Sequence, residues 1–207
     1  MTTTLQLKNK CICIQGNIGS GKSTVVHMLE QQQDSNSNYV CMLEPVNVWS
    51  DYKMDGKTIL EHFYADRKSY AFPFQMMAFY TRLNAMRQLP KDRTVIMERS
   101  VETDKRIFAE MLIEDGSIDP MCARIYNEWY NDLVSTVDDT INVYIRTPPE
   151  VCYERIHKRA RAGEDGISFD YLVHCHDLHE KWLMNTAHVI DGTQSTDVIM
   201  REVLSLI

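Results

Sequence analysis

The sequence predicts an α/β fold in which five parallel strands form one sheet flanked by helices. Short runs of continuous apolar residues recur along the chain, as in strands that are buried on both faces. Helical sequence lies between successive runs, and strands that alternate with helices form doubly wound sheets. Five runs fit this description: Cys11–Gln15, Tyr39–Leu43, Thr94–Met97, Ile141–Ile145 and Ala187–Ile190.

Helix signals stand between these runs. Lys22–Gln33 is expected to be helical and follows a glycine-rich loop, and Asp119-Pro120, Pro148-Pro149 and Ser168 are typical of helix N-termini. Apolar side chains at helical spacing are expected to face the core. They are Phe72, Met76, Phe79, Leu83 and Met86 ahead of Pro90, and Ile125, Trp129 and Leu133 beyond Pro120.

Length and composition fit one domain spanning residues 1–207. The formal charge of −7 argues against a nucleic-acid partner, and the chain has no apolar run of about 18 residues that would span a membrane. Six cysteines occur without a C-x-x-C pair, which is typical of reduced thiols in the cytoplasm or nucleus, and we expect the cytoplasm. The first apolar run begins already at Cys11, so we expect no secretory or transit peptide in this sequence.

A glycine-rich stretch follows the first run. It matches the pattern G-x-x-x-x-G-K-[ST], in which main-chain N–H groups surround phosphate oxygens. The helix N-terminus and Lys22 add positive charge, and the Ser23 hydroxyl is a suitable ligand for Mg²⁺. The stretch therefore predicts a P-loop that binds a nucleoside triphosphate. The residues expected at the phosphates are Gly16, Asn17, Gly19, Gly21, Lys22, Ser23 and Thr24.

Charged residues follow the second and third runs, at the sheet edge where α/β proteins bind ligands. Glu98 closes an apolar strand beside the P-loop, so we expect it to hold Mg²⁺ directly or through water. Its alternative role is that of an acid stabilised at a helix N-terminus. Glu44, at a neighbouring strand end, is suited to accept a proton from an attacking hydroxyl. We expect both acids and Arg99 to face the terminal phosphate.

A basic helix follows the fourth run. Arg155, Lys158 and Arg159 share one helical side, and Arg161 precedes glycines that allow a lid to move over the phosphates. Charge on a transferring phosphoryl group needs such cations. A solvated cationic helix end is the alternative.

The order and spacing of these motifs resemble those of the deoxynucleoside kinases, a family that contains deoxycytidine, deoxyguanosine and mitochondrial thymidine kinases and the insect multisubstrate enzyme. The resemblance covers the chain from Cys11 to about Trp182. It is carried by Ile14–Ser23, Glu44-Pro45-Val46 with Trp49, Phe72-Pro73-Phe74-Gln75, Glu98-Arg99-Ser100 and the lid arginines. The resemblance implies a P-loop kinase fold, transfer of the ATP γ-phosphate to the 5′-hydroxyl of a deoxynucleoside, and a homodimer.

The resemblance also implies roles for residues at the reacting groups. Glu44 would be the general base, and Arg99 would help to position it and the phosphates. Lys22, Ser23 and Glu98 would manage phosphate and Mg²⁺. The residues that align with lid arginines of the family are Arg155, Arg159 and Arg161.

The nucleoside site follows from the same resemblance. Tyr64 and Glu164 align with the pair that binds the sugar 3′-hydroxyl. The amide of Gln75 would donate to and accept from a base edge. The aromatic side chains around the base would be Phe74 and Phe108 on its faces, with Trp49 as an apolar wall.

Arg82 and Asp104 bear on the choice of base, because the resemblance places them where deoxycytidine and deoxyguanosine kinases carry an Arg–Asp pair. A buried pair would fill the space that the thymine methyl needs, and would present polar atoms to amino-substituted bases. We therefore expect deoxyadenosine, deoxycytidine or deoxyguanosine to be favoured over thymidine. An ordinary helix–helix salt bridge is the alternative.

Two other functions fit parts of the sequence. A nucleoside monophosphate kinase of the thymidylate kinase type also has a P-loop and a Glu-Pro after its second strand, and a non-catalytic P-loop protein would bind nucleotide without turnover. His174-Cys175-His176 with His179 offers metal-ligand side chains, but zinc needs four convergent ligands, so packing or solvated histidines are expected there. Asp138-Asp139 is expected to form a turn.

Overall fold

The computed structural model describes residues 10–134, 140–161 and 163–207. The strands are β1 (Cys11–Gln15), β2 (Tyr39–Met42), β3 (Lys53–Met54), β4 (Lys57–Thr58), β5 (Thr94–Glu98), β6 (Thr140–Arg146) and β7 (His188–Asp191). The helices are α1 (Lys22–Gln31), α2 (Val46–Trp49), α3 (Ile59–Ala65), α4 (Arg67–Arg87), α5 (Val101–Thr103), the π-helix η1 (Asp104–Ala109), α6 (Glu110–Glu114), α7 (Pro120–Leu133), α8 (Pro149–Arg159), the 3₁₀-helix η2 (Glu164–Gly166), α9 (Phe169–Leu183) and α10 (Thr196–Leu204). The turn expected at Asp138-Asp139 lies outside the described residues.

The predicted parallel sheet is confirmed. Its strand order is β2-β5-β1-β6-β7, with every neighbouring pair parallel. Each observed strand end lies within one residue of the end expected from the apolar runs. The chain continues from β1 to one side of the sheet and later returns to its other side, so the carboxyl end of β1 is the switch point at which such sheets bind ligands.

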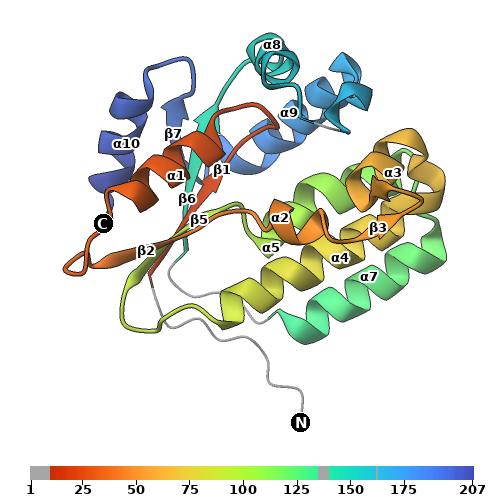
Figure 1. Ribbon diagram of the computed structural model, residues 1–207, viewed down its shortest axis with the longest axis horizontal. Coiled ribbons are helices and arrows are strands. Elements are labelled where there is room, and N and C mark those ends of the chain that lie inside the picture. The colour runs from red at the N-terminus through yellow and green to blue at the C-terminus, as the bar shows by residue number, and fades with distance from the viewer. Residues whose placement is uncertain (1–9, 135–139, 162) are drawn as a thin grey trace.

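Both faces of the sheet are covered, which explains the continuous hydrophobicity of its strands. Alternate residues of β1 point in opposite directions. Ile12 and Ile14 pack with α1 and α10, whereas Cys11 and Cys13 pack with α4, α5 and α7. Figure 1 shows α1 and α10 together on one side of the sheet, with α4 and α7 on the other. None of the described helices has the length and apolar composition needed to cross a membrane.

Helix α4 forms despite an internal proline. Pro73 has no N–H to donate, yet the helix runs from Arg67, where the Asp66 side chain caps it by accepting from the Ser69 N–H. The predicted N-termini of α7 and α9 are confirmed, since Asp119 and Ser168 accept main-chain hydrogen bonds there.

One expectation about the core is wrong. Ile125 and Trp129 of α7 are 37% and 52% exposed. The helix instead faces the core with Ala123, Tyr126 and Tyr130, which recur at their own helical spacing. Leu133, the third residue of the predicted stripe, does pack against the core, so the expectation is wrong for Ile125 and Trp129 and confirmed for Leu133.

Candidate active site

The P-loop joins β1 to α1 at the switch point of the sheet. Its glycines are required by close packing: a Cβ on Gly16 would lie 2.7 Å from the Ile145 carbonyl oxygen, and one on Gly19 would lie 2.6 Å from that of Cys152. Both glycines and Gly21 also have positive φ. The loop therefore adopts a shape that only glycine permits at these positions, with Gly21 directly ahead of α1.

Asn17 contributes to this loop differently from its neighbours. Its amide donates to the Leu172 carbonyl at 2.8 Å, and its Oδ1 accepts from the Ile18 N–H at 2.9 Å. The side chain is thus committed to joining the loop to α9. The main-chain N–H of Asn17 is therefore the group suited to a phosphate contact.

Lys22 lies inside the loop with its Nζ 2.6 Å from the Asn17 carbonyl oxygen. Burial, assisted by the positive charge of Arg99, lowers the pKa of Lys22 to about 7, against the opposing effect of Glu98 and Glu44. An arriving phosphate would supply the negative charge that this buried ammonium lacks.

Ser23 and Glu98 meet at the edge of the cavity. The Ser23 hydroxyl donates to Glu98 Oε1 at 2.6 Å, and both residues line the cavity together with Thr24. Hydroxyl and carboxylate oxygens are the ligands that Mg²⁺ prefers, and Mg²⁺ usually takes only one or two protein ligands beside phosphate and water. The two side chains therefore fit the ion that the sequence predicts.

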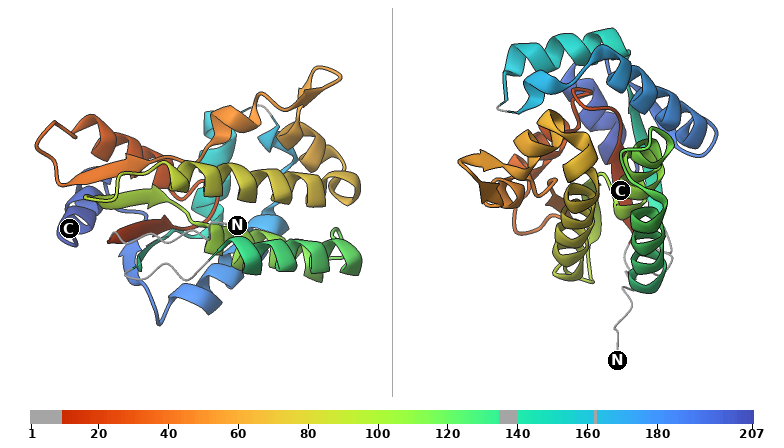
Figure 2. Two further views of the ribbon diagram at one scale, coloured as in Figure 1. Left: turned by 90° about the horizontal axis from the view of Figure 1, so that it is seen from below. Right: turned by 90° about the vertical axis from the view of Figure 1, so that its right-hand side faces the viewer.

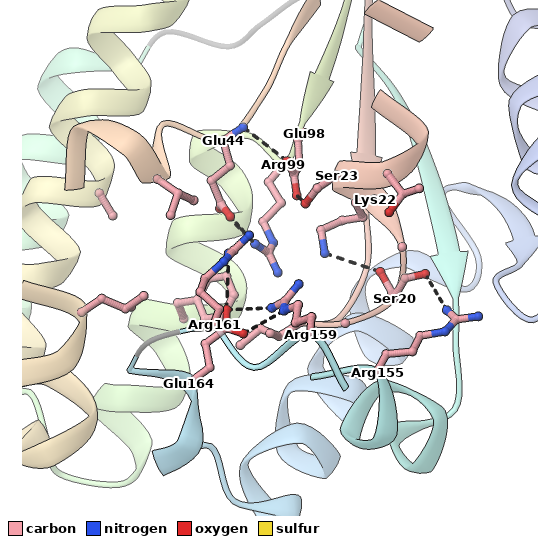
Figure 3. Close-up of a pocket in the computed structure, with 18 of the residues that line it drawn as sticks. Ser20, Lys22, Ser23, Glu44, Glu98, Arg99, Arg155, Arg159, Arg161 and Glu164 are labelled. Carbon is pink, nitrogen blue, oxygen red and sulfur yellow. Dashed lines mark hydrogen bonds and ion pairs between the residues drawn. The ribbon is translucent and has the colours of Figure 1, made fainter. Parts of the chain in front are cut away.

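Glu44 is held between two arginines. Arg99 Nη1 donates to both of its carboxylate oxygens, at 2.9 and 2.8 Å, and Arg82 Nη2 donates to Oε1 at 2.7 Å. Burial disfavours the charged form, but Arg99, Arg82 and Lys22 outweigh it and lower the pKa of Glu44 to about 2. Glu44 is thus ionised at neutral pH, and its carboxylate faces the P-loop (Figure 3).

Arg99 adopts an unusual backbone conformation. Its φ of 61° lies in the left-handed region, which costs a residue with a Cβ about 1–3 kcal/mol. The guanidinium lies 5.0 Å from the centroid of the Phe108 ring and donates to the Gly16 carbonyl at 3.4 Å. Arg99 therefore contacts Glu44, the P-loop and the aromatic wall at once.

A cavity of about 380 Å³ extends from the P-loop to an aromatic pocket. Trp49 and Phe74 meet edge to face there with ring centroids 5.5 Å apart, and the Trp49 indole donates to Thr81 Oγ1 at 2.9 Å. Gln75 is 2% exposed, and its Oε1 has no hydrogen-bond partner among the described residues. A buried amide oxygen without a partner is costly, so this one is suited to accept from a ligand. Phe108 lines the same cavity.

Arg82 and Asp104 form a buried ion pair. Arg82 Nε donates to Asp104 Oδ2 at 2.8 Å, and Arg82 Nη1 donates to the Glu98 carbonyl at 3.0 Å. Asp104 and Phe108 are the first and fifth residues of the π-helix η1, and both line the cavity. Arg82 lies behind the cavity wall, fully buried, and joins Asp104 to Glu44.

The lid region closes the other side of the cavity. Arg159 donates to both carboxylate oxygens of Glu164, at 2.8 and 2.7 Å, and Arg161 donates to one of them at 3.3 Å. Arg155 instead donates to the main-chain carbonyls of Ser20 and Gly192, at 3.3 and 3.1 Å. Figure 3 shows Arg159 and Arg161 gathered at Glu164, whereas Arg155 turns away from them toward Ser20.

Tyr64 lies beside Glu164 in the cavity lining. Burial and the nearby charge of Glu164 raise the pKa of Tyr64, so its hydroxyl keeps its proton and is a donor. The donor hydroxyl and the acceptor carboxylate are suited to bind one sugar hydroxyl from two sides.

The structure brings together more residues than the sequence predicted. The far end of the cavity is lined by Gly192, Gln194, Thr196 and Ile199, which follow β7, and Tyr171 lies near Tyr64. The ends of the other strands pointed to the site, and the end of the fifth apolar run carried the same signal. No charged or aromatic motif follows Asp191, so the sequence does not single out the residues after this strand.

Comparison with known proteins identifies the family to which the chain belongs. Residues 12–204 match the sequence profile of the deoxynucleoside kinase family. The chain therefore belongs to this family, and it is a deoxynucleoside kinase enzyme.

Individual relatives come from several viruses. A probable deoxycytidine kinase of Fowlpox virus is 38% identical over 179 residues, which are 84% of this chain and 72% of the relative. A putative kinase of Invertebrate iridescent virus 6 is 35% identical over 202 residues, 95% of each chain. A thymidine kinase of Ictalurid herpesvirus 1 is 34% identical over 203 residues, 94% of this chain and 84% of the relative. These names include both a deoxycytidine and a thymidine kinase, so the choice of base depends on the site itself.

Proposed function

We propose that the enzyme transfers the γ-phosphate of ATP to the 5′-hydroxyl of a deoxynucleoside, and that it prefers adenine, cytosine or guanine to thymine as the base. The observation that carries this proposal is the place of Glu44. Its carboxylate, held by Arg99 and Arg82, lies between the P-loop and the pocket of Gln75. A proton acceptor at the junction of a phosphate site and an aromatic base site fits a nucleoside hydroxyl as the acceptor.

Glu44 would accept the proton of the 5′-hydroxyl. A carboxylate with a pKa of about 2 is a weak base. It would therefore take the proton late, after most of the bond between the γ-phosphorus and the leaving ADP has broken. Its ionised form would also orient the hydroxyl by accepting its hydrogen bond. Arg99 would hold Glu44 in this position.

The donor half of the site would bind Mg·ATP. Main-chain N–H groups of the P-loop and the ammonium of Lys22 would bind the phosphates, and Ser23 and Glu98 would hold Mg²⁺. When bound, the ion neutralises charge on the β- and γ-phosphates. Arg155, Arg159 and Arg161 would stabilise the transferring phosphoryl group from the lid side.

The acceptor half would bind the deoxynucleoside. Tyr64 and Glu164 would bind the 3′-hydroxyl, and Phe74 and Phe108 would cover the faces of the base, with Trp49 at its edge. Because Glu164 also binds Arg159, the sugar contact and the lid would share one carboxylate.

The base preference rests on the Asp104 carboxylate. Gln75 Oε1, which has no hydrogen-bond partner among the described residues, would accept from a ring N–H or an amino group of any of the four bases, so it does not separate thymine from the others. Asp104 lines the cavity and would favour a base that donates from an amino group there, whereas thymine would present a carbonyl oxygen and a methyl group.

A panel of the four deoxynucleosides with ATP, and their 5′-monophosphates as alternative acceptors, tests the proposal. We expect turnover of deoxynucleosides, with thymidine as the poorest. Turnover of monophosphates alone would instead identify a nucleoside monophosphate kinase. ATP binding without turnover of any acceptor would identify a non-catalytic nucleotide-binding protein.

We also propose that the enzyme is a homodimer joined through α4 and α7. Met121, Ile125 and Trp129 follow each other at intervals of one helical turn on α7, and all three are exposed. Tyr80 of the neighbouring helix α4 is 55% exposed. Figure 2 shows α4 and α7 side by side along one edge of the molecule. A large aromatic and aliphatic patch of this kind is typical of a protein interface.

The remaining proposals concern the chain as a whole. We propose that residues 1–207 form one domain, a proposal supported by the single sheet shared by all long strands of the described residues. We also propose a reducing compartment such as the cytoplasm, which fits the free thiols of Cys13, Cys41, Cys122, Cys152 and Cys175.

A further inference from the structure

Gln15 is the last residue of β1. It lies outside the cavity, close to the backbone turn that begins at Arg99. The side chain is fully buried. Its Oε1 accepts from the Thr103 hydroxyl at 2.6 Å, and its Nε2 donates to Asn142 Oδ1 at 2.9 Å and to Ser100 Oγ at 3.4 Å. Both ends of the amide are therefore satisfied, and they join β1 to β6 and to the segment that follows β5.

The segment that Gln15 holds begins at Arg99. Arg99 has a φ of 61° and donates its N–H to the Ile14 carbonyl at 3.0 Å. The next residue, Ser100, donates its N–H to the Thr103 hydroxyl at 3.1 Å. The same hydroxyl donates to Gln15. A left-handed conformation is disfavoured for arginine and persists only where the surroundings fix it.

The side-chain contacts of Arg99 lie in the active site and not at this turn. They are with Glu44, the Gly16 carbonyl and the face of Phe108. Its Nε is buried and has no hydrogen-bond partner among the described residues. Substrates would meet the same groups, so a backbone turn held from outside the cavity would keep the direction of Arg99 when they bind.

We propose that Gln15 is a positioning residue for the reaction. Through Thr103 and Ser100 it holds the backbone turn that keeps the Arg99 guanidinium on Glu44. The inference rests on the proposed role of Arg99 in phosphoryl transfer. Gln15 itself touches neither substrate in this arrangement, so it acts only through Arg99.

Two substitutions at Thr103 separate this role from simple packing. Thr103→Val keeps the shape of the side chain but removes the hydroxyl that joins Gln15 to Ser100. Thr103→Ser keeps the hydroxyl and removes a methyl group. We expect Thr103→Val to lower kcat about 10- to 100-fold with little change in the KM of either substrate, because small misplacements of reacting groups have effects of this size. Thr103→Ser should stay within about threefold of the parent kcat.

Gln15→Met provides the second measurement. It should lower kcat as Thr103→Val does. The double variant should be about as active as either single variant, because both substitutions break the same hydrogen-bond network. Melting temperatures of all variants show whether each is folded at the assay temperature. If Gln15→Met fails to fold, the Thr103 pair still decides the question.

Arg99→Lys distinguishes failure of this inference from failure of the proposed function. An unchanged kcat in Arg99→Lys would remove the role of Arg99 in the reaction. A lowered kcat in Arg99→Lys, together with parental kcat in Thr103→Val and Gln15→Met, would overturn the positioning role of Gln15 alone. Equal loss in Thr103→Val and Thr103→Ser would also overturn it, because the hydroxyl would then be irrelevant.

Discussion

Arg82 donates from Nη2 to Glu44 Oε1 at 2.7 Å while its Nε donates to Asp104 at 2.8 Å. One buried arginine thus connects an acid in the base pocket to the proposed general base. The pair is a buried salt bridge between α4 and η1, and a role in base choice is proposed for it because Asp104 and Glu44 also line the cavity. Because a buried arginine next to a single remaining acid would be poorly paired, Arg82 and Asp104 should be changed together.

The first prediction concerns the choice of base. Replacing the pair by Arg82→Met and Asp104→Ala removes the acceptor at the base edge and opens space for the thymine methyl. The ratio of thymidine to deoxycytidine kcat/KM should rise about tenfold or more. Steady-state kinetics with both nucleosides gives the ratio. An unchanged ratio would show that the pair does not select the base, whatever happens to the absolute rates.

The second prediction concerns Glu44. Glu44→Gln keeps the size of the side chain but removes the proton acceptor, so kcat should fall by about 10²–10⁴. ATP affinity should be retained, because the P-loop is unchanged. The measurement is single-turnover kinetics beside ATP titration. Glu150→Gln, an exposed acid on α8, is the matched control and should behave like the parent. Parental turnover in Glu44→Gln would remove Glu44 from the chemistry.

The third prediction follows from the pKa of Lys22, which burial lowers to about 7. Bound phosphate stabilises the charged ammonium, so the pKa rises in the complex and ATP binding takes up a proton above pH 7. ATP affinity should therefore be full below pH 7 and should fall by up to about tenfold per pH unit above it.

Calorimetric titration at pH 8 in buffers of different ionisation enthalpy measures this proton directly, and about one proton per ATP is expected. Lys22→Arg is the control, because guanidinium stays charged throughout this range. Equal proton uptake by the parent and Lys22→Arg would assign the proton to another group.

Local patterns predicted most of the sheet and much of the site. Continuous apolar runs gave the five strands, because burial on both faces removes polar alternation. Glu44 and Glu98 were found because parallel strands end at one edge of a sheet. Neither signal reports contacts made across the fold, so the bond from Arg82 to Glu44, 38 residues apart, was not predicted.

Two further features of the structure could be predicted neither from apolar runs nor from charged residues at strand ends. The π-helix that carries Asp104 and Phe108 has no sequence pattern of its own. Helical spacing identified the stripe of Ile125 and Trp129 but not what it faces, because an interface between copies has the same periodicity as a core.

The last prediction tests that exposed stripe. Trp129→Glu places a charge in the centre of the proposed interface, where it would be buried without a partner, and burial of an unpaired charge is strongly unfavourable. The parent should sediment as a dimer at micromolar concentration and Trp129→Glu as a monomer. The fold should survive, since Trp129 is 52% exposed and contributes little to the core. Asn131→Glu adds the same charge to an exposed position of α7 away from the stripe, and should leave the dimer intact. A monomeric parent would contradict the homodimer itself. Dissociation by both variants would show that net charge on α7, and not the apolar stripe, decides association.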